Sequence, residues 1–233
     1  MTLGVLGGLG PMSSVYFYEL LVSLTDASTD QEHLDVLISS RATTPDRTAF
    51  IVGTSDSDPA PVMAEEARRL ESAGADVIAI PCNTAHYFYE KIHDAVSIPV
   101  LNIIDLTCKR VAESGAHALG ILATEGTIKS GAYGIICEKY GLAYVTPNDE
   151  EQAFISHTIY ERIKRGEAAD TEGMKRVIAS LISRGADKIV LGCTELSLMA
   201  RECDFGDAVI DSLETLAASA IEFCGKKVKK KTE

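Results

Sequence analysis

An internal repeat is the feature of this sequence that most constrains its fold. The segment Gly74–Cys82 (GADVIAIPC) aligns with Gly185–Cys193 (GADKIVLGC) at an offset of 111 residues, and five of the nine positions are identical. Leu70 and Leu181 continue the match upstream at the same offset. Similarity at one fixed offset indicates a duplicated structural unit. The sequence therefore predicts two related halves, each with a cysteine just past a strand.

A second match supports the duplication. Leu3–Leu6 (LGVL) resembles Leu119–Leu122 (LGIL) at an offset of 116 residues, so each half opens on the same type of strand. The alternative is that Gly-Ala-Asp before an apolar strand is a common helix-to-strand turn. That alternative accounts for Gly74 and Gly185 as helix C-caps, but not for the paired cysteines or for the second match.

Short apolar runs alternate with segments of helical periodicity along the whole chain. Strands are expected at residues 3–6, 34–38, 77–80, 98–101, 119–122, 143–145 and 189–191. Helices are expected at residues 12–25, 62–73, 85–95, 106–113, 129–140, 150–165 and 171–184. This alternation favours an α/β architecture. We expect two pseudosymmetric lobes, each a parallel sheet flanked by helices, with the active site in the cleft between them.

The repeat also sets the expected boundaries of the lobes. Residues 1–98 and a returning segment, 207–225, form the first lobe, which carries Cys82, and residues 99–206 form the second, which carries Cys193. The tail 226–233 contains five lysines and one acid. We expect this tail to be flexible and solvated, and a tail that binds anions is the alternative.

Composition and charge exclude several classes of protein. Hydrophobic residues make up 46% of the chain, which is enough to bury a core and excludes disorder as the main state. The formal net charge of −12 disfavours nucleic acid and anionic membranes as partners. No apolar run approaches the roughly 18 residues of a membrane span. The N-terminus does not read as a secretory signal, and the six cysteines form no C-x-x-C pair, so we expect free thiols in the cytoplasm.

The two repeated cysteines suggest a specific chemistry. Ligands bind at the carboxyl ends of strands in open parallel sheets, so Cys82 and Cys193 are expected to face each other across the cleft. Each lies near a helix N-terminus, where the partial positive charge favours a thiolate. Asn83, Thr84 and Thr194 beside them can bind a carboxylate. One thiolate can remove a proton from carbon while the opposite thiol returns one to the other face. The pair thus indicates racemisation or epimerisation without a cofactor.

Other kinds of site find no support in the sequence. The glycines of residues 4–10 lack the G-x-G-x-x-G spacing of a dinucleotide site. The chain has no HExxH, P-loop or G-x-S-x-G pattern. We therefore expect neither a nucleotide nor a metal.

Five motifs carry a resemblance to a known family. They are residues 7–12 (GGLGPM), 45–48 (PDRT), 81–86 (PCNTAH), 160–164 (YERIK) and 191–196 (LGCTEL). Together they resemble the aspartate/glutamate racemase family, and look most like its aspartate racemase branch, over nearly the whole chain to about Phe223. The glutamate racemase branch has an acid after the first strand and a histidine after the second Cys-Thr. Here those places hold glycine-rich sequence and Glu195.

The resemblance implies a cofactor-independent racemase with two pseudosymmetric domains, commonly a homodimer. It implies that Cys82 and Cys193 are the two acid/base thiols. It also implies that Arg47 and Lys164 hold the distal carboxylate of the substrate, and that the loop around Leu9 borders the substrate. From periodicity alone, Lys164 would instead be a solvated residue near a helix C-terminus.

The residues that flank the two cysteines have further expected roles. Asn83, Thr84 and Ala85 match the family's turn that binds the α-carboxylate. Glu195 either orients Cys193 or caps the helix that follows it. His86 either tunes the thiolate of the first cysteine motif or has a structural role.

We therefore expect an aspartate racemase of D-amino acid metabolism that interconverts L- and D-aspartate by proton transfer between Cys82 and Cys193. A broad-specificity amino-acid racemase of the same family is the alternative. A non-catalytic protein that binds small molecules on the same two-lobed frame is a third possibility, disfavoured because both thiols are retained. The expected partners are the amino-acid substrate and a second copy of the chain, with no nucleic acid and no membrane.

Overall fold

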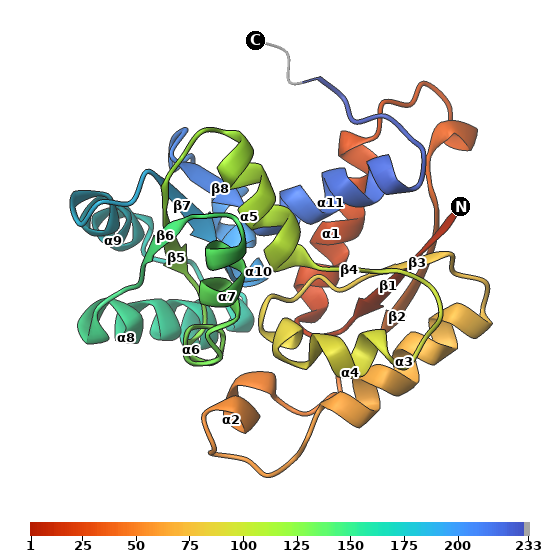
Figure 1. Cartoon of the computed structure of the whole chain (residues 1–233), viewed down its shortest axis with the longest axis horizontal. Helices are drawn as coiled ribbons and strands as arrows, with labels where there is room; N and C mark the ends of the chain where they lie inside the picture. The colour runs from red at the N-terminus through yellow and green to blue at the C-terminus, as the bar shows by residue number, and fades with distance from the viewer. Residues whose placement is uncertain (231–233) are drawn as a thin grey trace.

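Two four-stranded parallel sheets organise the computed structural model, which describes residues 1–230 (Figure 1). The first sheet has the strand order β2-β1-β3-β4, and the second has the matching order β6-β5-β7-β8. The strands are β1 (Thr2–Gly7), β2 (Asp35–Ser40), β3 (Val77–Ala79), β4 (Val100–Leu101), β5 (Ala118–Leu122), β6 (Ala143–Val145), β7 (Lys188–Leu191) and β8 (Val209–Asp211). The expected α/β fold with two pseudosymmetric lobes is confirmed.

Helices connect the strands and cover the sheets. The α-helices are α1 (Pro11–Leu24), α2 (Arg47–Ile51), α3 (Ala60–Ser72), α4 (Tyr89–His93), α5 (Ile103–Glu113), α6 (Glu125–Lys129), α7 (Ala132–Lys139), α8 (Asp149–His157), α9 (Thr171–Ser183), α10 (Thr194–Ala200) and α11 (Ser212–Phe223). Short 3₁₀ turns are η1 (Asp30–Glu32), η2 (Thr84–Phe88) and η4 (Ile163–Arg165), and η3 (Thr158–Arg162) is a π-helical turn.

The strand register shows that the sequence repeat is also a structural repeat. Gly4 of β1 pairs with Ile78 of β3, and Gly120 of β5 pairs with Ile189 of β7. These four residues are the equivalent positions of the two sequence matches. Both duplicated strand pairs therefore keep the same register.

The two repeated strand glycines allow a helix-to-strand turn to approach the sheet closely. A Cβ placed on Gly4 would lie 2.9 Å from the Cβ of Ala75, and a Cβ placed on Gly120 would lie 3.2 Å from the Cβ of Ala186. Both distances are shorter than ordinary van der Waals contact. The Leu-Gly and Gly-Ala-Asp segments of each repeat are thus two halves of one packing contact.

Apolar side chains alternate between the two faces of each sheet, as strand geometry requires. Leu3 and Val5 of β1, with Leu119 and Ile121 of β5, belong to one core shared with α1, α5, α7 and α11 between the sheets. The outer face of the first sheet packs on α3, and that of the second packs on α8 and α9. Figure 1 shows α1, α5 and α11 in the middle, with α3 and α9 on opposite sides.

The helix after the last strand of each sheet packs on the opposite lobe. Helix α5 follows β4 and packs on α7, whereas α11 follows β8 and packs on α1. Helices α5 and α11 also pack on each other. Asn102 and Asp211 cap these two helices in the same way, each accepting the backbone N–H groups two and three residues further on. This exchange of helices joins the two lobes.

Strand pairing places both lobe boundaries later in the chain than the repeat predicts. Strand β4 pairs with β3, so the first sheet extends to Leu101 and does not end at residue 98. Strand β8 pairs with β7, so the second sheet extends to Asp211 and does not end at residue 206. The returning segment is α11, which lies against α1 of the first lobe. Both boundaries were placed too early because the last strand of each lobe lies outside the two repeat matches.

Three expected helices are interrupted. Residues 85–95 divide into η2 and α4, and residues 150–165 pass from α8 into η3 and η4. Residues 129–140 are broken between α6 and α7 at Gly131, whose φ of 67° is left-handed. Strand β8 and helix α2, with three and five residues, are too short for periodicity to reveal.

The lysine-rich tail is attached to the first lobe over part of its length. The backbone N–H of Asp26 donates to the carbonyl oxygen of Lys227, and that of Lys229 donates to the carbonyl oxygen of Leu24. Val228 forms an isolated antiparallel bridge with Thr25. These contacts differ from the expectation of a tail that is flexible from residue 226. Residues 231–233 of that expected tail lie outside the described residues.

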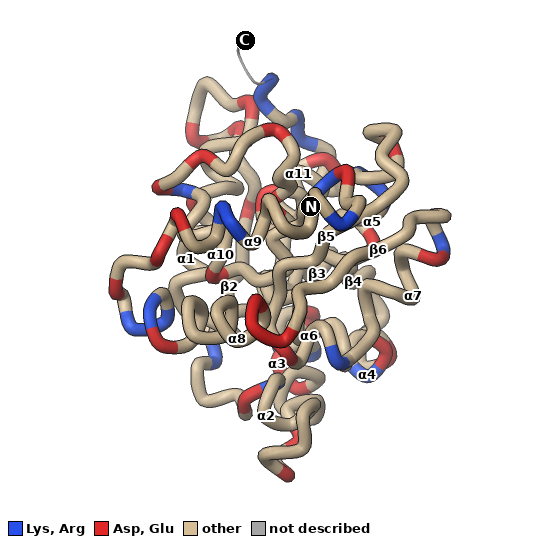
Figure 2. Tube along the Cα trace, turned by 90° about the vertical axis from the view of Figure 1, so that its left-hand side faces the viewer, with Lys and Arg blue, Asp and Glu red and all other residues tan. Residues whose placement is uncertain are grey.

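Charged residues of both signs are interspersed over the molecule, and lysines gather at its C-terminal end (Figure 2). Within residues 1–230, no helix is both long and apolar enough to cross a membrane.

We expect Gly4→Ala to lower the free energy of unfolding by about 1–3 kcal/mol, because the added methyl group overpacks the contact with Ala75. Ala75→Gly removes the opposing carbon, so the double variant should lose less than the sum of the two single variants. Urea denaturation of the four proteins measures this coupling. Strictly additive losses would contradict the proposed contact.

Candidate functional site

A small cavity lies between the lobes, at the carboxyl ends of the strands. It encloses about 300 Å³ of space that is open to solvent. Its lining comes from both lobes: Leu9, Asp46, Arg47, Thr48, Cys82, Asn83, Thr84, Thr124, Tyr160, Lys164, Cys193, Thr194 and Glu195. This space includes open solvent, and little of it is wide enough for a water molecule, so the cavity is narrow and suits only a compact ligand.

The structure brings nine of the ten residues expected at the site into this cavity. The exception is Ala85, which is fully buried in the apolar core of the first lobe beneath α3. Residue 85 follows the turn of Cys82, but its methyl group points to the core and not to the cavity.

Cys82 lies three residues beyond β3 and is held there by His86. The backbone N–H of Ile103 donates to His86 Nε2 at 3.2 Å, so the ring proton is on Nδ1, which donates to the carbonyl oxygen of Cys82 at 2.9 Å. Burial lowers the pKa of His86 to about 4, and the ring is therefore neutral. The imidazole anchors the backbone of the cysteine turn to the start of α5.

Cys193 occupies the equivalent place in the second lobe, as the N-cap residue of α10. Ser197, four residues later, is the repeat equivalent of His86. Its hydroxyl donates to Asp211 Oδ1 at 2.6 Å, at the start of α11. Each cysteine turn is thus hydrogen-bonded to the start of the helix after the last strand of its sheet, α5 or α11. The first contact uses an imidazole, and the second uses a hydroxyl and a carboxylate.

The thiol of Cys193 lies beside a pair of charged side chains, Glu195 and Lys164. Its Sγ donates to Glu195 Oε2 at 3.0 Å, and Glu195 Oε1 lies 3.7 Å from Lys164 Nζ. Burial raises the pKa of the Cys193 thiol well above its usual range, the Glu195 carboxylate raises it further, and Lys164 opposes the change. This corrects the expectation that the helix N-terminus makes Cys193 a thiolate, because burial and a neighbouring negative charge outweigh the dipole of a seven-residue helix.

The two lobes approach each other closely at Gly10, where a larger residue would collide with Glu195. A Cβ on Gly10 would lie 2.6 Å from Glu195 Oε1, and the φ of Gly10 is 132°. Any other residue would displace this carboxylate from Cys193. The glycine-rich segment after β1 therefore leaves room for a charged group from the opposite lobe.

Arg47 brings a buried positive charge to the cavity. The residue is 8% exposed, and its guanidinium donates to the carbonyl oxygens of Leu9 at 2.9 Å and Pro45 at 3.1 Å. Within residues 1–230, its Nε has no hydrogen-bond partner. A buried guanidinium that is met only by carbonyl dipoles lacks the carboxylate such groups ordinarily pair with. The geometry indicates a site for an anionic ligand group.

Hydrogen bonds across the cleft join the first cysteine turn to the second lobe. The Thr84 hydroxyl lies 2.9 Å from the hydroxyls of both Thr124 and Thr127. Asn83 accepts from the Tyr133 hydroxyl at 2.8 Å and donates to Ser212 Oγ at 3.0 Å. These bonds fix the lobes relative to each other beside the cavity.

Sequence reasoning missed Thr124 as a lining residue and assigned no role to Tyr160, Asp46 or Thr48. Tyr160 lies on the π-helical turn η3, and its ring is 4.7 Å from Lys164 Nζ. Tyr160, Asp46 and Thr48 fall within the motifs that carry the family resemblance, which could have flagged them. Thr124 gave no such signal, since its repeat equivalent is Gly8.

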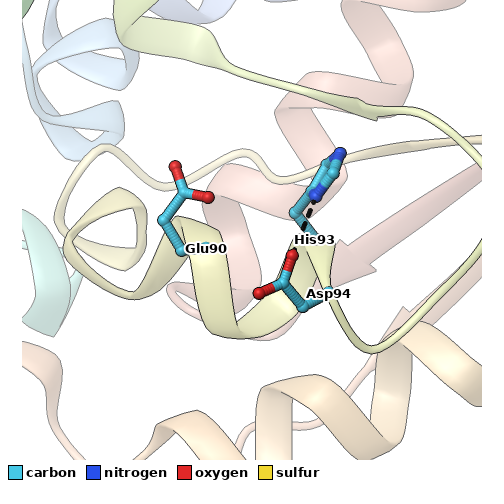
Figure 3. Close-up of side chains that lie close together, drawn as sticks. All are labelled: Glu90, His93 and Asp94. Atoms are coloured by element: carbon cyan, nitrogen blue, oxygen red, sulfur yellow. Dashed lines mark hydrogen bonds and ion pairs between the residues drawn. The ribbon is translucent and has the colours of Figure 1, made fainter.

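Another cluster of titratable groups lies away from the cavity. Glu90, His93 and Asp94 place potential metal ligands within 4.8 Å of one another, and all three residues are exposed (Figure 3). The dashed contact in Figure 3 joins His93 to Asp94. Acidic groups of this kind are common on surfaces without a metal, and none of the three lines the cavity.

The two thiols, which come from opposite lobes, line the cavity together with the cationic side chains of Arg47 and Lys164. Such an arrangement suits proton transfer to and from a carbon atom next to a carboxylate.

Comparisons with known proteins show which proteins this chain resembles. A family model described as Asp/Glu/Hydantoin racemase matches residues 6–220. The chain is 30% identical over 223 residues to the broad specificity amino-acid racemase RacX of Bacillus subtilis, a match that covers 94% of this chain and 96% of that one.

Solved structures of known proteins share this fold. An aspartate racemase of Picrophilus torridus superposes with a TM-score of 0.84 at 32% identity, covering 98% of this chain and 96% of that one. An aspartate racemase homologue from Pyrococcus horikoshii superposes with a TM-score of 0.78 at 27% identity, covering 96% and 99%.

His86 and Asp211, which hold the two cysteine turns, have opposite effects on the free energy of unfolding as the pH falls. His86 has a folded-state pKa of about 4, below the ordinary 6.5 or so. The unfolded chain therefore binds this proton first, and His86 lowers the free energy of unfolding as pH drops from about 6.5 to 4, by up to about 3 kcal/mol. Burial raises the pKa of Asp211 to about 6, so this group has the opposite sign over nearly the same range.

Asp211→Asn should therefore stabilise the protein at pH 7, by at most about 3 kcal/mol, and this gain should vanish near pH 4. The stability of the variant should then fall more steeply with acid than that of wild type, because the contribution of His86 is no longer offset. Asparagine keeps the cap, as Asn102 does for α5. Urea denaturation from pH 7 to 4 measures both curves, and a constant gap between them would contradict the assignment.

Proposed function

Because the chain belongs to the Asp/Glu/hydantoin racemase family, we propose that it is a cofactor-independent amino-acid racemase that interconverts L- and D-aspartate. In this proposal Cys82 and Cys193 are the two acid/base groups. The observation that carries it is that both repeat-related cysteines line one cavity, together with a buried arginine that has no carboxylate partner among the described residues.

The proposed reaction involves two protons, one removed from Cα and a different one supplied to its opposite face. The thiolate on one side takes the proton from Cα, and the thiol on the other side gives its proton to the opposite face of the same carbon. The electron pair left by the broken C–H bond forms the new C–H bond, so no oxidant or reductant is needed. Both sulfurs end with exchanged protonation states.

Two groups of side chains would hold the substrate. Arg47 and Lys164 both line the cavity and would bind the distal carboxylate. Asn83 and Thr84 would bind the α-carboxylate, with the hydroxyl of Thr124 beside Thr84 adding a further donor. A dicarboxylic amino acid uses both groups.

A broad-specificity amino-acid racemase is the second candidate function. The similarity to the Bacillus subtilis enzyme supports it, and so does a wider cavity next to the site. That cavity shares Arg47, Lys164 and Glu195 with the first and also has apolar lining from Met12 and Leu198. A side chain longer than that of aspartate would extend into this space.

We also propose that the protein is a homodimer. Met12, Val15, Tyr18 and Val22 expose apolar side chains at intervals of three or four residues along α1. Ile38 of the edge strand β2 is likewise exposed. A second copy of the chain would cover this surface.

The decisive experiment is racemisation by the two single-cysteine variants. Cys82→Ala and Cys193→Ala should each abolish interconversion of aspartate in both directions, since each turnover needs both sulfurs. Circular dichroism of each enantiomer, under reducing conditions, follows the reaction, and wild type is the reference.

Cys203→Ala is the matched control, because Cys203 does not line the cavity, and it should remain active. Near-native racemisation by either Cys82→Ala or Cys193→Ala would refute the two-thiol mechanism. Inactivity of wild type on a panel of amino acids would favour a binding protein instead.

Substrate choice provides a separate prediction. Lys164→Ala should lose roughly 2–5 kcal/mol of transition-state stabilisation on aspartate, which is about thirtyfold or more in kcat/KM. The loss on alanine should be much smaller, since alanine has no distal carboxylate. Equal losses on both substrates would show that Lys164 does not recognise that carboxylate.

A further inference from the structure

The pseudosymmetry of the lobes breaks down two residues after each cysteine. Thr84 follows Cys82 and Glu195 follows Cys193, at the same repeat offset of 111. A neutral hydroxyl thus stands on one side of the cavity where a carboxylate stands on the other. The two thiols therefore differ in their electrostatic surroundings, although both come from the same sequence motif.

On the second-lobe side, the carboxylate is placed to retain the thiol proton. Glu195 accepts the S–H of Cys193 at 3.0 Å and is 6% exposed, so solvent screens it little. Loss of the thiol proton would leave two negative charges within hydrogen-bond distance. Lys164, at 3.7 Å from the carboxylate, offsets part of that repulsion.

Of the other titratable groups near Cys193, Asp46 and Arg47 line the same cavity, and two tyrosines are neutral. Tyr160 of η3 and Tyr133 of α7 both have pKa values raised above the usual range by burial, so neither phenol carries charge at neutral pH. Glu195 and Lys164 are the charged groups that act most on this sulfur, and the carboxylate has the direct contact.

On the first-lobe side, Thr84 engages other hydroxyls. It lies 2.9 Å from both Thr124 and Thr127, and those two lie 3.0 Å from each other. Three hydroxyls arranged in this way can each donate once and accept once. Thr84 therefore brings no charge toward Cys82.

We propose that Glu195 is a positioning residue that keeps the proton on Cys193 in the free protein, so that Cys82 is the base and Cys193 the acid when a turnover begins. The inference rests on the proposed function. Cys82 takes the proton from Cα, and Cys193 gives its S–H proton to the opposite face. The enantiomer whose Cα–H faces Cys82 is the one that the resting protein can use.

A return step follows from this asymmetry. After that turnover Cys82 is a thiol, and Cys193 is a thiolate beside the Glu195 carboxylate. That form is the less stable one, and it reverts when Cys82 releases a proton to solvent and Cys193 regains one. The second enantiomer reacts only with this shifted form.

Alkylation by iodoacetamide, resolved by peptide mass mapping, tests the resting protonation without any turnover. The thiolate is the reactive form. Cys82 and Cys193 are 6% and 5% exposed, so access does not distinguish them. In wild type at neutral pH, Cys193 should be modified more slowly than Cys82 by about tenfold or more, because the raised pKa of Cys193 leaves it little thiolate.

Glu195→Gln should raise the alkylation rate of Cys193 by about tenfold and move its pH midpoint downward, with little change at Cys82. Glu195→Asp keeps the charge and should retain part of the protection. Glu167→Gln is the matched control, because Glu167 is an exposed residue paired with Arg162. Cys108 and Cys137 are fully buried, so their continued slow modification shows that each variant is folded.

Equal alkylation of Cys82 and Cys193 in wild type would overturn the inference, and so would an unchanged ratio in Glu195→Gln. The proposed function fails separately. If wild type racemises no amino acid but Glu195 still protects Cys193, the proposed function is refuted and the proton assignment stands. If wild type racemises aspartate with equally reactive thiols, the function stands and the assignment is refuted.

Discussion

The shared apolar layer between the two sheets is the constraint on which the rest of the structure depends. The inner faces of both sheets pack on α1, α5, α7 and α11, and the closing helix of each lobe packs on the other lobe. Neither lobe can bury its inner face alone. Because both sheets are parallel and share one topology, this packing brings the carboxyl ends of their strands together. The cavity and its two cysteines are the consequence of that arrangement.

The two halves share their backbone architecture but differ in the side chains that follow each cysteine. The glycine contacts and strand registers match in the two lobes. The residues after the cysteines do not: His86 corresponds to Ser197, and Thr84 corresponds to Glu195. The surroundings of the two sulfurs differ as a result, because only Cys193 is hydrogen-bonded to a carboxylate.

Charge at the cavity is arranged to leave one position for an anion. Lys164 is partly satisfied by Glu195 and lies over the Tyr160 ring. Arg47 is buried among carbonyl oxygens and keeps an unused N–H. A ligand carboxylate would complete the set, since burial of an unpaired guanidinium is otherwise unfavourable. The same two cations border the wider neighbouring cavity.

The sequence by itself determined the duplication, the parallel α/β lobes and the pairing of Cys82 with Cys193, because these follow from local apolar patterns and from similarity at a fixed offset. Prediction from the sequence failed at positions where neither periodicity nor the repeat gave a signal. Strand β8 is three residues long, and Thr124 has no resemblance to its repeat partner Gly8. Only the tertiary structure decided that Ala85 points to the core and that Cys193 retains its proton. The physical reason is that burial and electrostatics are set by distant groups: Lys164 comes from thirty-one residues upstream of Glu195, and Gly10, which leaves room for that carboxylate, comes from the other lobe.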